Sequence, residues 1–312
     1  MKHVRFIALV ATLSLGSVAV GVAAPKPAAP PSQFVPEVIY PYKSSTSEDL
    51  RLSNASGTAA VLLHRGRAIL AYDLAPPSLR LATYIDTDVN NMRHLRVRSW
   101  TTTATGGIAV GPERTLVSSV NMVQADFSPT GDRIAFRTGD HITGYDLNVV
   151  DVATGVVTKI STARSIVHLR WSQDGNSFYY QAFNNDDGVV RDMTAFRQPL
   201  GGGEPVLIFQ RPVINSSDIS RDGKDGLILR VSVPGSTNYA LGQWDGSTIT
   251  TLPFLNANFP HYSCGNDRLI YRSATNGSPG PVKIHTFATN SDITFSRDKL
   301  IIQADFMPCD VP

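Results

Sequence analysis

The chain has 312 residues, of which 42% are hydrophobic and 17% charged, so it can bury a core and lacks the composition of a disordered protein. It carries 28 Lys and Arg residues against 26 Asp and Glu residues. This near-neutral balance argues against nucleic acid or anionic lipid as a partner. Because 22 of the acids are Asp, and Gly and Pro number 24 and 20, short strands joined by tight turns are expected rather than helices.

The first segment has the three-part pattern of a secretory signal. Lys2 and Arg5 precede an apolar run over residues 6–22, and small residues follow as far as Ala24. We expect residues 1–24 to be a signal peptide, 25–36 a Pro- and Ala-rich linker, and 37–312 the folded domain. An uncleaved anchor is the alternative, for which the run is marginal in length. The pattern predicts a periplasmic or secreted protein without a stable membrane span after cleavage.

The rest of the chain repeats one unit. Its clearest copy, residues 125–160, holds a short strand, a Ser-Pro-x-Gly turn and three further strands. Four strands in about 40 residues is the size of a propeller blade. The turn begins at an anchor position that recurs at intervals of 43 to 53 residues, namely at Ala75, Ser128, Ser172, Ser220 and Ser263.

The two ends of the chain together supply the strands of one further blade. Residues 303–308 nearly repeat residues 124–129, so they predict the first strand of another blade, and no strand follows them. The N-terminal segments 38–40, 49–54 and 59–63 would supply its missing strands. We therefore predict an all-β, six-bladed β-propeller whose ring is closed by the C-terminal strand pairing with N-terminal strands, which removes exposed sheet edges.

The repeats resemble the WD40-like propeller repeat of TolB-type proteins. The resemblance rests on residues 126–131, 171–175 and 219–223, and it extends over residues 37–312. The α/β domain that precedes the propeller in TolB has no counterpart here, where only the linker is expected. The resemblance implies an extracytoplasmic propeller that binds a protein or peptide, and we expect a monomer.

Two cysteines occur, Cys264 and Cys309. In the repeat frame each lies in the turn after the first strand of its blade, and the two blades are neighbours. An even number of cysteines in an exported chain predicts a disulfide, here one that locks the closure of the ring. Two free thiols are the alternative.

The repeat register also predicts a polar collar. The residue one before each anchor is apolar, and the residue two before it is polar. Since side chains alternate along a strand, the polar set points away from the core, and the first strand of a blade lines the central channel. The collar residues are Asp73, Asp126, Arg170, Asp218, His261 and Asp305. We hypothesise that they bind a cation or a cationic group; the alternative is that each Asp accepts hydrogen bonds from backbone amides of its own or the next blade.

Sequence motifs for catalysis are missing: there is no nucleophile elbow, zinc motif or phosphate loop. The acidic segment 184–188 could hold Ca²⁺ or another divalent ion, but it lacks EF-hand spacing and a terminal Glu, so we interpret it as a loop between strands and expect no cofactor. These observations favour a non-enzymatic propeller that binds a protein or peptide. The alternative is an extracytoplasmic lyase or hydrolase acting on a sugar or lactone, with a metal or His/Asp site at the channel mouth built from His168, His261 and the collar Asp residues.

Overall fold

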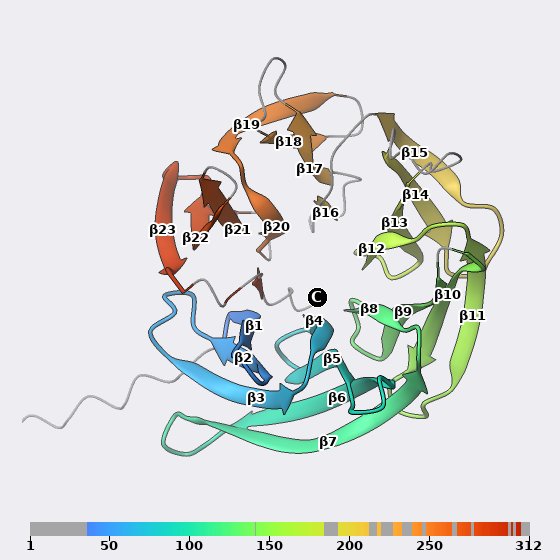
Figure 1. The fold of residues 1–312 in the computed structure, drawn as a ribbon, viewed down its shortest axis with the longest axis horizontal. Coiled ribbons are helices and arrows are strands. Elements are labelled where there is room, and N and C mark those ends of the chain that lie inside the picture. The colour runs from blue at the N-terminus through green and yellow to red at the C-terminus, as the bar shows by residue number, and fades with distance from the viewer. Residues whose placement is uncertain are drawn as a thin grey trace, which may run out of the picture. The chain divides into compact units, whose positions relative to one another are not determined.

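The computed structural model describes residues 36–140, 142–183, 193–211, 217–219, 227–232, 239–244, 248–263, 267–275, 278–298, 301 and 304–306. The regular elements among these residues are β-strands, which form six four-stranded antiparallel sheets arranged around a common centre (Figure 1). The predicted all-β propeller architecture is therefore confirmed. The β-branched and aromatic residues of the strands, and the turns between them, give this fold directly.

Each sheet is listed here in its hydrogen-bonded order, starting from the strand nearest the centre. The first sheet is β24 (Asp305–Phe306), β1 (Val38–Lys43), β2 (Glu48–Ser53) and β3 (Ala60–Gly66). The second is β4 (Ile69–Leu74), β5 (Leu81–Thr87), β6 (Arg93–Thr102) and β7 (Ile108–Ser119). The third is β8 (Val123–Phe127), β9 (Arg133–Asp140), β10 (Gly144–Asp151) and β11 (Val157–Ala163).

The remaining three sheets follow the same order. The fourth is β12 (Val167–Trp171), β13 (Ser177–Phe183), β14 (Met193–Pro199) and β15 (Val206–Arg211). The fifth is β16 (Ser217–Ile219), β17 (Leu227–Ser232), β18 (Tyr239–Trp244) and β19 (Ile249–Leu255). The sixth is β20 (Asn258–Tyr262), β21 (Arg268–Thr275), β22 (Ser278–Thr286) and β23 (Ser291–Ser296).

The first sheet joins distant parts of the chain. Strand β24 pairs with β1, with Phe306 opposite Val38, and an isolated bridge links Tyr42 to Ile301. Val38 and Phe306 also share one apolar cluster with Ile270 of β21, so this sheet packs against the sixth sheet. Residues from the two ends of the described chain thus meet in one sheet.

The repeated Ser-Pro-x-Gly segment forms the turn between the first two strands of a sheet. The amide of Gly131 donates to the carbonyl oxygen of Ser128 at 2.8 Å, and Gly175 does the same to Ser172 at 3.0 Å. Gly131 has φ +69°, and a Cβ there would collide with Leu79. A left-handed conformation in a crowded turn favours glycine, which explains the glycine of the repeat.

The apolar residue before each anchor lies in the core between sheets. The side chains described at this position are at most 7% exposed; they are Leu74, Phe127, Trp171, Tyr262 and Phe306. Leu74 packs with Leu50 and Leu63 of the preceding sheet. The predicted inward packing of this position is confirmed for these residues, and it fixes the direction of the polar neighbours that alternate with them.

No helix long and apolar enough to cross a membrane occurs among the described residues. The expected signal peptide, residues 1–24, and the linker as far as residue 35 lie outside these residues. So do Cys264, Cys309 and the acidic segment 184–188.

Candidate functional site

The innermost strands of four sheets begin with an irregular residue. Pairing with the second strand shifts register at Leu70 of β4, Gln124 of β8, His168 of β12 and Phe259 of β20. Gln124, His168 and Phe259 have φ values of +59°, +52° and +50°. Each of these three stands four residues before its anchor. A bulge redirects side chains, and non-glycine residues in the left-handed region store backbone strain that is concentrated at functional sites.

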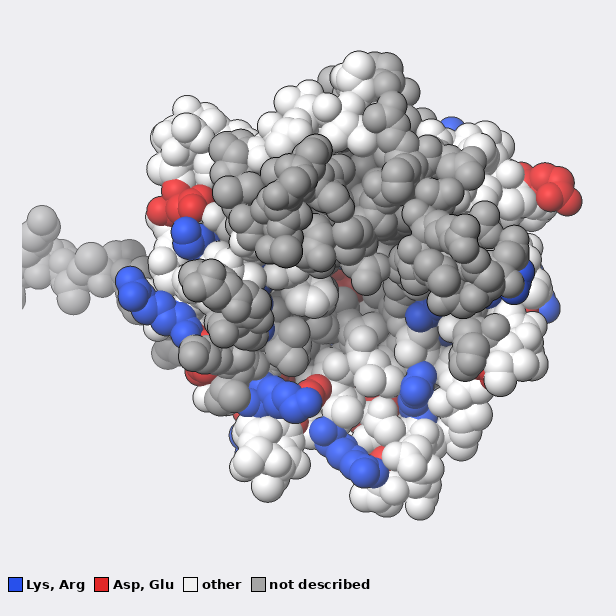
Figure 2. Space-filling model, turned by 45° about the horizontal axis from the view of Figure 1, so that its top comes forward, with Lys and Arg blue, Asp and Glu red and all other residues white. Residues whose placement is uncertain are grey.

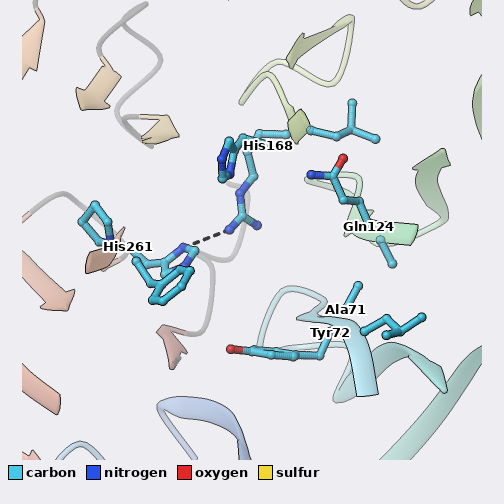
Figure 3. A pocket seen from close by; sticks show the side chains of 11 residues that line it. Ala71, Tyr72, Gln124, His168 and His261 are labelled. Atoms are coloured by element: carbon cyan, nitrogen blue, oxygen red, sulfur yellow. Dashed lines mark hydrogen bonds between the residues drawn. The ribbon is translucent and has the colours of Figure 1, made fainter. Parts of the chain in front are cut away.

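These irregular strand starts surround one cavity of about 210 Å³. Its lining residues come from β4, β8, β12 and β20 (Figure 3). The polar ones are Tyr72, Gln124, His168, Arg170 and His261. At its edge, Leu70 and Phe259 are 42% and 38% exposed. None of the described lining residues carries a carboxylate.

Three residues from three sheets form a central cluster beside this cavity: Asp126, Arg170 and His261. Arg170 Nη1 donates to Asp126 Oδ1 at 2.8 Å, and Arg170 Nη2 lies 3.0 Å from His261 Nδ1 (Figure 3). Asp126 and His261 are each only 6% exposed. Because a guanidinium only donates, we assign His261 as the neutral tautomer, whose Nδ1 accepts and whose Nε2 carries the hydrogen.

The aspartates of the collar connect neighbouring sheets. The amide of Phe127 donates to Asp73 Oδ2 at 2.6 Å, and the amide of Trp171 donates to Asp126 Oδ2 at 2.6 Å. The Trp171 indole Nε1 also donates to the carbonyl oxygen of Asp126 at 3.0 Å. In both aspartates the carboxylate therefore accepts a backbone amide from the next sheet, which is the alternative role weighed for this position.

The structure brings three of the six collar residues into the central cluster and places Asp73 at the junction of β4 and β8. The side chains of Asp218 and Asp305 lie outside the described part of the chain. Within the described part, no group of three or more His, Cys, Asp or Glu side chains is arranged to hold a metal ion.

A second set of buried and half-buried polar residues, the seam cluster, joins the first and second sheets. It consists of His64, Tyr84, Asp86, Arg96 and Glu113. His64 Nδ1 lies 2.9 Å from Glu113 Oε2, and His64 Nε2 lies 3.3 Å from Asp86 Oδ2. Arg96 Nε donates to Asp86 Oδ1 at 2.8 Å, while Arg96 Nη1 and the Tyr84 hydroxyl both contact Glu113.

Burial alone would raise the pKa values of the two seam carboxyls. For Asp86 the hydrogen bonds from His64 and Arg96 outweigh burial and lower its pKa. For Glu113 the hydrogen bond from Tyr84 and the charge of Arg96 do the same. Burial and the nearby Glu113 raise the pKa of Tyr84. Both carboxylates are thus stabilised in their charged form.

The predicted collar used the residues one and two positions before each anchor. The residue four positions before the anchor, which lines the cavity, was not predicted. Gln124 and Phe259 therefore went unrecognised as site residues, and so did Tyr72; His168 entered only through the enzyme alternative. A signal existed, because Gln124 recurs as Gln303 in the near-repeat at the end of the chain.

Charge is not concentrated on the surface in view. Figure 2 shows the basic side chains of described residues at several separate points, with neutral residues between them.

No protein-family model matches the sequence, and no curated protein matches it significantly. Among solved structures, TolB from Acinetobacter baumannii has a TM-score of 0.70 and 16% identity, covering 88% of this chain and 67% of that one. Oligogalacturonate lyase in complex with manganese has a TM-score of 0.56 and 12% identity, over 77% and 72% of the two chains.

Oligogalacturonate lyase from Vibrio parahaemolyticus has a TM-score of 0.53 and 13% identity, over 79% and 74% of the two chains. At such identities the likeness is one of fold, and one fold serves both a TolB and a lyase. The described chain therefore has the β-propeller fold of TolB-like proteins.

Proposed function

We propose that this protein is an exported, non-enzymatic β-propeller that binds a protein or peptide at the mouth of its central cavity. The observation that carries the proposal is the cavity itself, in which polar side chains from four sheets converge inside an apolar edge. Binding pockets combine a few placed polar groups with apolar walls in this way. Three strained residues at equivalent repeat positions lie in its lining, which supports a functional role.

The partner can be tested by site-specific photo-crosslinking. A photoreactive phenylalanine analogue replaces Phe259 at the cavity edge or, as a matched control, Val157, which is 45% exposed. Val157 pairs with Val150, and Val150 and Phe127 both pair with Ile134. Val157 therefore lies at the Phe127 end of the third sheet, away from Gln124. We expect one protein from an extract of the source cells to crosslink at Phe259 only. Equal products at both positions, or none at Phe259, would contradict the proposal.

We also propose that the six sheets are the six blades of one closed ring and that β24 closes it. The pairing of β24 with β1 supports this arrangement. We place a disulfide between Cys264 and Cys309 across the closing blades, which would add about 4 kcal/mol of stability by the chain-entropy relation. Peptide mass mapping without reduction should find the linked pair; alkylation of both cysteines in the native protein would exclude it.

Export follows in this proposal from removal of residues 1–24. The protein recovered from the envelope or the medium should begin immediately after Ala23 or Ala24. N-terminal sequencing checks this, and an intact N-terminus starting at Met1 would contradict cleavage.

A second candidate is an extracytoplasmic enzyme acting on a sugar or lactone, because His168 and His261 line the same cavity. Elemental analysis of the mature protein separates the two candidates. A stoichiometric divalent ion that is lost in Asp126→Asn and Asp218→Asn, while both variants remain folded, would favour the enzyme.

A further inference from the structure

We infer that the boundary between the third and fourth sheets binds an oxyanion, a carboxylate or a phosphate group, through Arg137 with Arg93 beside it. The inference goes beyond the proposed function, because neither arginine lines the cavity. Arg137 of β9 forms no ion pair within the described part of the chain; it contacts the carbonyl oxygen of Ile166 and the ring of Tyr145. A guanidinium held inside the protein without a carboxylate keeps a charge that a ligand can neutralise.

Arg137 is held in position by the elements on both sides of it. Its Cζ atom lies 4.4 Å from the centroid of the Tyr145 ring in β10. Its Nη1 atom donates to the carbonyl oxygen of Ile166, which directly precedes β12 of the fourth sheet. The Tyr145 hydroxyl also acts on the guanidinium, but a phenol is neutral below its ordinary pKa near 10. These contacts orient the guanidinium and leave its charge in place, which lowers the entropy lost when a ligand binds.

The outer side of the guanidinium is the part that a ligand can approach. The Nε atom of Arg137 is enclosed and has no hydrogen-bond partner among the described residues, so the inference gives it no role. The residue as a whole is half-buried, so part of its side chain reaches solvent. A ligand therefore approaches the two Nη atoms, which carry four N–H groups, one of them directed at Ile166.

Arg93 of β6 adds a second positive charge. Its Nη1 atom donates to the carbonyl oxygen of Met122 at 3.1 Å, and it forms no ion pair with a described residue. Met122 directly precedes Val123, which faces Arg137 in the strand ladder, so the two arginines approach each other near the start of β8. Burial lowers the pKa of Arg137, and the charge of Arg93 lowers it further. Like charges in this arrangement repel, and an anion between them would remove the repulsion.

The carboxylates on the neighbouring strands are bound elsewhere. Asp140 at the end of β9 accepts two backbone amides of the turn that follows it. Asp146 of β10 pairs with Lys159 at 2.8 Å. No described carboxylate is among the groups that shift the pKa of Arg137. The charge at this boundary is therefore positive, which favours an anionic ligand over a neutral or cationic one.

The shape of the donor group favours an oxyanion over a halide ion. A guanidinium offers N–H groups in one plane, and these match two oxygen atoms of a carboxylate or a phosphate. A halide ion has no second acceptor atom to use this geometry. A carboxylate and a phosphate share the chemistry that the site recognises, so the experiment has one arm for each.

Thermal unfolding of the purified mature protein tests the inference. The midpoint is measured with increasing sodium phosphate in one arm and sodium acetate in the other, at an ionic strength kept constant with sodium chloride. An anion that binds only the folded state raises the midpoint and the binding saturates, whereas general stabilisation by salts grows steadily with concentration. We expect at least one of the two anions to give a saturable rise of about 2 °C or more. The anion that does so identifies the oxyanion.

Variants then locate the binding. Arg137→Met removes the charge and keeps an apolar stem, so the saturable rise should disappear. Because this change also removes the contacts with Ile166 and Tyr145, Arg93→Met provides a second variant that leaves Arg137 in place; it should weaken binding of the anion about threefold to tenfold. Arg133→Met makes the same change at the opposite end of β9, where the side chain is 44% exposed, and should keep the full rise.

The outcomes are decisive in both directions. A saturable rise that is lost in Arg137→Met and weakened in Arg93→Met supports the inference. No saturable rise with either anion overturns it, and so does a rise of equal size in the wild type and Arg137→Met. A rise that is lost to the same extent in Arg133→Met also overturns it, because the effect would then follow the net charge of the protein. None of these results depends on crosslinking at Phe259, so failure of this inference and failure of the proposed function are distinguishable.

Discussion

The central cluster and the seam cluster use the same chemistry in different settings. Each combines arginine, histidine and carboxylate across a boundary between sheets, with buried side chains and short contacts. The seam cluster has two carboxylates for its arginine and histidine, and none of its residues lines the cavity. The central cluster has one described carboxylate, and its arginine and histidine both reach the cavity.

The same residue types therefore do not by themselves make a binding site. In the seam cluster the positive groups are matched by carboxylates within the protein, so its role is to join the first and second sheets. In the central cluster Arg170 is also paired with a carboxylate, that of Asp126, but Arg170 and His261 line the cavity as well. Buried ion pairs add less stability than their contacts suggest, because desolvation offsets the attraction. Access to a cavity, rather than the ion pair itself, is what distinguishes the central cluster as a candidate site.

The largest expected effect comes from breaking the central cluster. Asp126→Ala removes the partner of Arg170 and the acceptor of the Trp171 amide, so the free energy of unfolding should fall by about 3–5 kcal/mol. Urea unfolding measures this. Asp146→Asn, which breaks an exposed pair with Lys159, is the control and should lower it by less than about 1 kcal/mol. Similar losses in both variants would mean that the central cluster has no special structural role.

A smaller loss is expected in the seam cluster. Glu113→Gln keeps the shape of the side chain but removes the charge that faces Arg96 and His64, so unfolding should require about 2 kcal/mol less. The same variant should still crosslink a partner at Phe259 as the wild type does, because Glu113 does not line the cavity. A loss of crosslinking at Phe259 in this variant would remove the distinction between the two clusters.

Lowering the pH should reduce the difference in free energy of unfolding between the wild type and Glu113→Gln. The pKa values of Asp86 and Glu113 are lowered in the folded protein. The two carboxylates therefore contribute fully to the free energy of unfolding when the pH is above their ordinary pKa values, near 4. This contribution disappears as the pH falls through the lowered values, where wild-type Glu113 also becomes protonated. Urea midpoints of the two proteins should therefore converge below about pH 4. If the two urea midpoints stay equally far apart down to about pH 2, Glu113 stabilises the protein by packing rather than by its charge.

The smallest effect concerns the strained strand starts. Gln124→Gly relieves a left-handed backbone and should raise the free energy of unfolding by about 0.5 kcal/mol, since the relief of about 1–2 kcal/mol exceeds the entropic cost of glycine. Ala125→Gly in the same strand has no such strain and should lower it by about 1 kcal/mol. Thermal unfolding of both variants provides the comparison. A loss in both would show that the bulge at Gln124 stores no strain.

Much of the fold could be predicted from local sequence. The Ser-Pro-x-Gly turns and the apolar residue before each anchor act within a few residues of each other, so their pattern reveals the strands and the repeat. The same register located Asp126, Arg170 and His261 as neighbours around a centre. It left open whether Asp73 and Asp126 bind a cation or accept backbone amides, because the amide contacts that form depend on the stagger between sheets.

The cavity was decided by tertiary structure alone. Gln124, His168 and Phe259 share a repeat position but differ in residue type, and it is the bulges at the strand starts that direct them, with Leu70, toward one cavity. Bulges depend on how a strand pairs with its partner and on the twist of the sheet, which no short segment specifies. Turns and alternation within the chain therefore specify the propeller and its repeat, while the packing of the sheets around the centre sets which polar side chains line the cavity and which contact each other.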